Sequence, residues 1–176
     1  MDHEFSNTQM SLNDLPKIGD IEFVPLEKDY LLVIILSKMV SQIITAIFLI
    51  VFLTLMPFDL TITILKLVGV TFVVYLLWSY ISAIYGFRHK QFALREKDII
   101  YKTGWIWRSM TVAPFNRVQH VRIDQGPIER QFNLSRLKIF TAGGSSSDLT
   151  IPGLNPGMAE SLKEYIVEQT KQDEEE

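Results

Sequence analysis

The chain has 176 residues, of which 48% are hydrophobic, and a formal net charge of −3. Its length allows for one ordinary domain, and the lack of cysteine excludes disulfides, thiolate metal sites and a cysteine nucleophile. The charge is segregated: residues 88–138 carry eleven Lys and Arg against four carboxylates, whereas the segments 1–38 and 139–176 are acidic.

Residues 1–25 form a polar N-terminal segment in which Pro16, Gly19 and Pro25 interrupt any long element. Its few apolar residues fit either packing against a later domain or contact with a membrane surface. The sequence after Pro25 is typical of a helix start, with proline in the first turn and the acid Glu27 beside the N-terminus. We therefore expect the first long helix to begin near residue 26.

Residues 26–87 predict a transmembrane helical hairpin. Met39–Phe58 is a run of twenty residues without a charged side chain, and Leu67–Phe87 is a run of twenty-one. Each run reaches the roughly 20 apolar residues needed to cross a bilayer core of about 30 Å. Apolar side chains cover every face of both runs, whereas a core helix of a soluble protein usually has a polar stripe. The short link Asp59–Lys66 allows only antiparallel neighbours.

The charges beside the hairpin predict its orientation, because short loops rich in Lys and Arg stay cytoplasmic. Such residues flank the two outer ends of the hairpin, whereas the link has Lys66 alone. We therefore expect a multi-pass protein of the cell membrane with both termini in the cytoplasm. The acidic segment of about thirty residues before the first apolar run disfavours a cleavable signal peptide.

Residues 88–168 predict a small antiparallel β domain. Six strand-length segments are separated by turn residues: 91–95, 98–102, 105–112, 117–125, 137–141 and 148–151. A single helical turn is expected at 127–132. A longer closing helix follows Asn155, which suits an N-cap, because apolar residues then recur on one face at helical spacing. The acidic residues 169–176 are expected to form a disordered tail.

The same segments carry a family resemblance. The strings that carry it are GWIWR (104–108), VAPFNRVQHV (112–121), QGPIER (125–130), LKIFTAGG (137–144) and LTIPGL (149–154). Together with the preceding hairpin, they resemble the bacterial pleckstrin-homology (PH) domains of the YdbS-like membrane proteins. The resemblance implies an α+β fold, in which a two-helix transmembrane hairpin precedes a PH-like antiparallel β-barrel or sandwich of seven strands, capped by a C-terminal α-helix. It implies no enzymatic chemistry.

The polar residues form no catalytic or metal-binding pattern. His89 and His120 have no carboxylate or cysteine at ligand spacing, which favours a charge beside the membrane and a strand surface residue. Gly143–Ser147 lacks the ending of a phosphate-binding loop and is expected to be a flexible hairpin connection. Trp105 and Trp107 alternate as on one strand face, which favours core or interdomain packing over nucleic-acid binding. We expect no enzyme activity, no cofactor and no nucleic-acid partner.

Two functions fit these patterns, both with the lipid bilayer as a partner. The first is a membrane-anchored interaction module at the cytoplasmic face that assembles with itself, as a homo-oligomer, or with other PH-domain membrane proteins. The alternative is a domain that senses lipid headgroups of the anionic inner leaflet. For either function, the candidate binding residues are six cations that face anionic lipid or a partner: Arg88, Lys90, Arg95, Lys97, Arg117 and Arg122.

Overall fold

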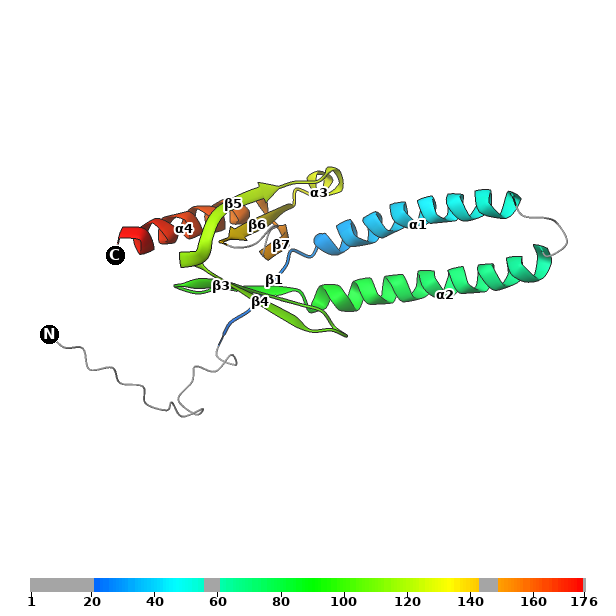
Figure 1. Ribbon diagram of the computed structural model, residues 1–176, viewed down its shortest axis with the longest axis horizontal. Coiled ribbons are helices and arrows are strands. Elements are labelled where there is room, and N and C mark those ends of the chain that lie inside the picture. The colour runs from blue at the N-terminus through cyan, green and yellow to red at the C-terminus, as the bar shows by residue number, and fades with distance from the viewer. Residues whose placement is uncertain (1–20, 56–60, 143–148, 176) are drawn as a thin grey trace, which may run out of the picture.

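The computed structural model describes residues 21–55, 61–142 and 149–175. A long helical hairpin projects from one side of a β domain, and a C-terminal helix covers another side of that domain (Figure 1). The predicted hairpin connection at residues 143–147 lies outside the described residues, as do residues 1–20 and 56–60.

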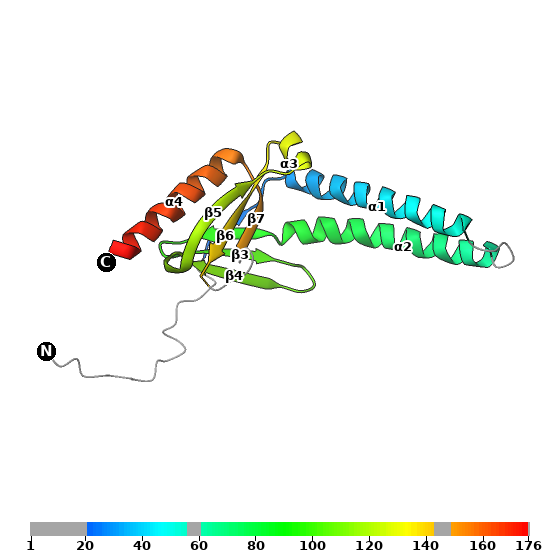
Figure 2. The ribbon, with the colours of Figure 1, turned by 45° about the horizontal axis from the view of Figure 1, so that its top comes forward.

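The hairpin consists of α1, Tyr30–Thr54, and α2, Thr61–Arg88. At 1.5 Å per residue these helices are about 37 and 42 Å long, more than the roughly 30 Å of a bilayer core. They lie side by side (Figures 1 and 2), yet only 11% of the most apolar window of each helix is buried. Most of their apolar surface therefore faces outward, as expected of helices exposed to lipid. The structure agrees with the predicted transmembrane hairpin.

Hydrogen bonds between the two helices occur toward the domain end of the hairpin. The Lys38 ammonium donates to the backbone oxygen of Ser79 at 3.0 Å and to its hydroxyl at 3.1 Å. The Tyr80 hydroxyl donates to the side-chain oxygen of Gln42 at 2.9 Å. We call these four residues the polar layer. A lysine is costly inside hydrocarbon, so the polar layer marks the edge of the bilayer core.

The β domain contains two antiparallel sheets. The first has the order β1-β2-β3-β4, formed by Val24–Pro25, Gln91–Leu94, Asp98–Thr103 and Ser109–Pro114. The second has the order β5-β6-β7, formed by Val118–Asp124, Ser135–Thr141 and Leu149–Leu154. Among the described residues the two sheets do not join into a closed barrel. The fold is α+β with a PH-like sandwich, as predicted.

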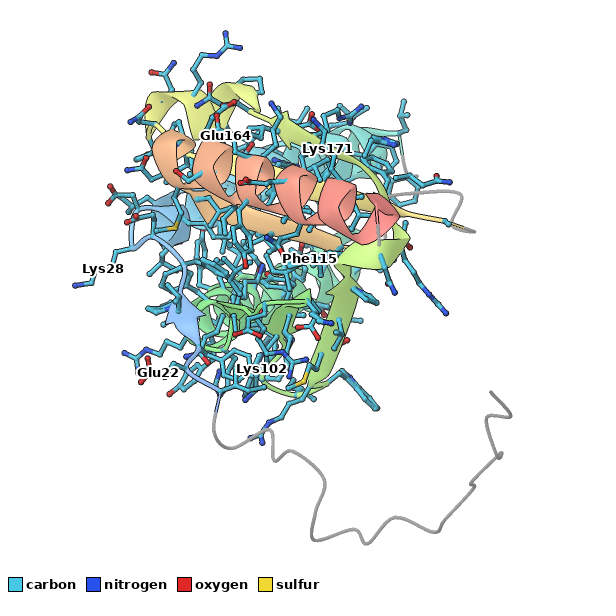
Figure 3. All side chains as sticks on the ribbon, turned by 90° about the vertical axis from the view of Figure 1, so that its left-hand side faces the viewer. Glu22, Lys28, Lys102, Phe115, Glu164 and Lys171 are labelled. Atoms are coloured by element: carbon cyan, nitrogen blue, oxygen red, sulfur yellow. The ribbon has the colours of Figure 1, made fainter. Side chains whose placement is uncertain are left out.

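Three helices accompany the sheets: the 3-10 turn η3, Phe115–Arg117, the short α3, Pro127–Gln131, and α4, Pro156–Glu175. The Asn155 side chain accepts a hydrogen bond of 2.8 Å from the Gly157 amide, which confirms the predicted N-cap. Figure 3 shows α4 lying across the domain above Phe115. Its inner face buries Ala159, Leu162 and Ile166 in the core. The helix closes the sandwich, as predicted.

The C-terminal end of α4 differs from the sequence-based expectation. Residues 169–175 were expected to be disordered because they are acidic, but the helix continues through them to Glu175. Gln, Lys and Glu are good helix formers, and adding a residue to an existing helix costs far less than nucleating a new one. The established helix therefore extends into the acidic segment.

The seventh strand lies before the hairpin. Val24 and Pro25 of β1 pair with Phe92 and Gln91 of β2, and Leu26, only 4% exposed, enters the same core as Phe92. The boundary predicted at residue 88 therefore cuts through the domain core. A two-residue strand whose partner follows the entire hairpin leaves no local periodicity, so the sequence pattern showed only six strands.

Candidate functional site

An open cleft of about 700 Å³ lies where the hairpin meets the β domain. We call it the junction cleft. Its walls are formed by the segment Val24–Asp29 before α1, by the end of α2 with Phe87 and Arg88, and by two further residues, Lys90 and Met158. Its position at the base of the hairpin places it beside the membrane surface.

Both charge signs line the junction cleft. The cations are Lys28, Arg88 and Lys90, and the acids are Glu27 and Asp29. Figure 3 shows the Lys28 side chain extending away from the domain. A cleft with this mixture can hold a polar group that carries both a negative and a positive charge, such as a phospholipid headgroup, and its apolar residues can contact glycerol or acyl carbons.

Lys90 is the most enclosed cation of the cleft. Its ammonium lies 5.4 Å from the centre of the Tyr30 ring, within the range of a cation–π contact. Burial lowers the pKa of Lys90, because the charged form loses water contacts. An anionic group in the cleft would compensate for that loss. Lys90 is therefore the cation that gains most from a bound anion.

A backbone hydrogen bond and a close packing contact hold this end of the hairpin against the domain. The backbone amide of Glu27 donates to the carbonyl oxygen of Gly153 at 3.1 Å. Gly153 has a φ of +63°, and a Cβ built on it would lie 2.4 Å from the Tyr30 ring. Only glycine allows this close approach of β7 to the start of α1. The cleft walls therefore have a defined relative position.

The six predicted cations do not form one cluster. Arg88 and Lys90 line the junction cleft. Strand β2 starts beside α2 and runs away from it for four residues, about 13 Å, before reaching the β2–β3 turn with Arg95 and Lys97. At that turn Arg95 is paired with Asp98, and hydrogen bonding to this carboxylate raises the pKa of Arg95.

The last two predicted cations lie elsewhere. Arg117 ends η3, near the β2–β3 turn, because the preceding Phe115 amide donates to the Lys97 carbonyl oxygen at 3.0 Å. Arg122 lies on β5, where it is paired with Asp124 at 2.9 Å. Of the six predicted cations, the structure thus places only Arg88 and Lys90 at the membrane end of the domain. They are joined there by Lys28, which was not among the predicted binding residues.

Both candidate histidines contact neighbouring groups of the chain. The ring nitrogen Nδ1 of His89 lies 2.8 Å from the carbonyl oxygen of Tyr85, and His120 stacks on Phe140 with 4.1 Å between ring centres. Within the described residues, no group of three or more His, Asp and Glu is placed to hold a metal ion. The lack of enzyme activity stays a prediction.

The tryptophan prediction is wrong in part. Trp105 and Trp107 lie in the loop Gly104–Arg108 between β3 and β4, not on a strand face. Trp105 packs against Trp78 and Tyr85 of α2, with ring centres 6.1 and 5.4 Å apart, so its predicted interdomain packing is confirmed. Trp107 is 88% exposed. Gly104, with a φ of +91°, ends β3 early and turns the chain into this loop.

A transmembrane hairpin that is fixed to an α+β sandwich with a C-terminal closing helix defines the class of a membrane-anchored PH-like protein. The chain belongs to the bacterial PH domain family, whose sequence profile matches residues 30–170. It is similar to the UPF0699 transmembrane protein YdbS of Bacillus subtilis (strain 168), with 34% identity over 102 residues. These residues make up 56% of this chain and 62% of YdbS, so the chain spans less than two thirds of that relative. No solved structure matches the chain.

Proposed function

We propose that this protein is a membrane-anchored PH-like interaction module that assembles, at the cytoplasmic face, with itself or with related PH-domain membrane proteins through strand β4. Within the described residues β4 pairs with β3 alone and forms an edge of the first sheet. The unpaired backbone groups of an edge strand can bind a strand from another chain. The free edge of β4 is the observation on which the proposal rests.

The side chains of β4 favour such pairing. Met110 and Val112 lie two residues apart on the same face, and Val112 is 46% exposed. Exposed edges in monomeric proteins are usually protected by charges or proline, whereas β4 contains no charged residue and has proline only at its last position, Pro114. The hairpin also confines all copies to one plane and one orientation, which favours encounters between their edges. Strand β4 runs back from the loop that packs beside α2, so copies held in one membrane orientation present their β4 edges in the same direction.

Charge substitutions at Val112 test the proposal. Val112→Lys places like charges near each other where two β4 edges meet, so the assembly should dissociate into single chains in lipid nanodiscs. Val112→Glu should do the same. Mixing the two variants should restore pairs that contain one copy of each, and the β-branched variant Val112→Thr should leave assembly unchanged. If both charged variants assemble as well as the wild type, β4 is not the contact.

A second function is supported by the junction cleft, where Lys28, Arg88 and Lys90 line a cavity beside the membrane. Here the domain would bind an anionic phospholipid headgroup of the inner leaflet. The double variant Lys28→Gln and Lys90→Gln should retain less phosphatidylglycerol in native mass spectrometry, and Lys97→Gln at the β2–β3 turn is the control. Equal retention by the double variant and the control would exclude the cleft as a headgroup site.

A further inference from the structure

The loop Gly104–Arg108 extends beyond the sheet toward the membrane. In the register of the first sheet, Gln91, the first residue of β2, pairs with Lys102. Strand β3 therefore continues past the start of β2, and the following loop lies beside the end of α2. Figures 1 and 2 both show the tip of the β3–β4 hairpin alongside α2.

Contacts with α2 fix the depth of this loop. Trp105 packs on Trp78 with 6.1 Å between ring centres. Trp78 lies ten residues before the end of α2 at Arg88, about 15 Å along the helix axis. It also directly precedes Ser79, a member of the polar layer that marks the edge of the bilayer core. The loop therefore reaches the level at which the hairpin enters the membrane.

The loop exposes large apolar side chains at that level. Trp107 is 88% exposed and Ile106 is 53% exposed. The tight turn at Gly104 supports this presentation, because a Cβ there would overlap the Trp107 carbonyl oxygen. Tryptophan is enriched at the boundary between lipid headgroups and acyl chains, where its ring contacts hydrocarbon and its N–H meets water. Arg108, next to Trp107, can extend to the phosphates.

We propose that the loop Gly104–Arg108 is a separate membrane-docking element, whose Ile106 and Trp107 side chains enter the interfacial region of the leaflet from which the hairpin emerges. The occupant of this apolar surface is the bilayer itself. The apolar surface of the loop is continuous with the exposed apolar side chains of α2 through Trp105, Trp78 and Tyr85. Together with the two helices, the loop gives the β domain a third attachment to the membrane, which restricts its rotation about the hairpin.

This element differs from the proposed headgroup site in its chemistry. The contact is apolar, so it does not depend on anionic lipid, whereas binding in the junction cleft does. The element also does not depend on assembly through β4. The three proposals can therefore fail independently.

Fluorescence quenching in nanodiscs tests the docking element. The full-length chain has three tryptophans, so the double variant Trp78→Phe and Trp105→Phe leaves Trp107 as the sole reporter. Its emission should be blue-shifted, quenched several-fold by phosphatidylcholine brominated high on the acyl chain, and protected from aqueous iodide. The same quenching should occur with and without phosphatidylglycerol.

Two controls complete the test. A chain with all three native tryptophans replaced by Phe and with Lys97→Trp reports from the β2–β3 turn, and its emission should be quenched by iodide and insensitive to brominated lipid. Subtracting the emission of Trp107→Phe from that of the wild type gives the emission of Trp107 in a chain that keeps Trp78 and Trp105. This difference spectrum should show the same quenching as the double variant. Iodide quenching of Trp107 as strong as in the Lys97→Trp control would overturn the proposal. Protection from both iodide and brominated lipid would also overturn it, because a protein surface would then cover the loop.

Discussion

Replacing Leu26 tests whether the domain core begins before the hairpin. Leu26 is 4% exposed and packs in the cluster that contains Phe92 and Leu154. Truncating a buried leucine to alanine removes packed methyl groups and leaves a cavity, which costs roughly 2–5 kcal/mol. Leu26 lies at the margin of the core, so we expect Leu26→Ala to lower the free energy of unfolding of the β domain by about 3 kcal/mol. A loss of this size corresponds to a change of about a hundredfold in the unfolding equilibrium.

Hydrogen exchange of the full-length protein in nanodiscs measures this change. Amides of the central strands, such as those of Ile99 and Ile139, exchange only when the domain opens. In Leu26→Ala their exchange should accelerate by about a hundredfold. Val24→Ala, in the same segment but with an exposed side chain, should change it little. Equal protection of these amides in Leu26→Ala and the wild type would show that residues before the hairpin do not belong to the core.

Three further predictions concern the closing helix, acid stability and topology. Leu162→Asp places a charge where α4 packs on the core. It should lower the free energy of unfolding by several kcal/mol and abolish the cooperative melting of the domain. An unchanged melting curve would show that α4 is not part of the core. Hydrogen bonding to Lys138 lowers the pKa of Asp124 from its ordinary 3.8, so the pair stabilises the fold above that pH and this contribution disappears as the pH falls through the lower folded-state pKa. Because solvent still reaches this partly buried pair and screens it, its contribution should be below about 1 kcal/mol. Unfolding curves of Asp124→Asn and the wild type should therefore converge at low pH, and a constant difference down to pH 2 would refute the linkage. On intact cells an impermeant thiol reagent should label Asp59→Cys, whereas it should label Ser161→Cys only after lysis; the opposite pattern would reverse the proposed orientation.

Local patterns were sufficient to predict most of the elements. The apolar runs specify α1 and α2 because a bilayer requires a fixed number of consecutive apolar residues. The closing helix carries its own N-cap at Asn155 and an apolar stripe, and each of the six predicted strand segments overlaps a strand. These signals depend on residues that are close together in the sequence.

Features that depend on distant residues were missed. Strand β1 exists only because β2, on the other side of the hairpin, pairs with it. The loop at Trp107 forms because Gly104 ends β3 before the tryptophans, although their alternation resembles a strand. The clustering of cations could not be inferred from their spacing either: Lys90 and Lys97 are close in sequence, but β2 carries the second away from the membrane. A positional prediction for such a site needs the strand direction, which the sequence did not supply.

Native mass spectrometry of particles extracted from the membrane with a lipid-retaining polymer tests assembly most directly. One chain has a mass of 20.3 kDa. The proposed function predicts particles that contain at least two copies of this chain, or one copy together with another PH-domain membrane protein, and it predicts that Val112→Lys reduces them to single chains. Wild-type particles that contain a single copy and no other protein, at every expression level, would contradict it.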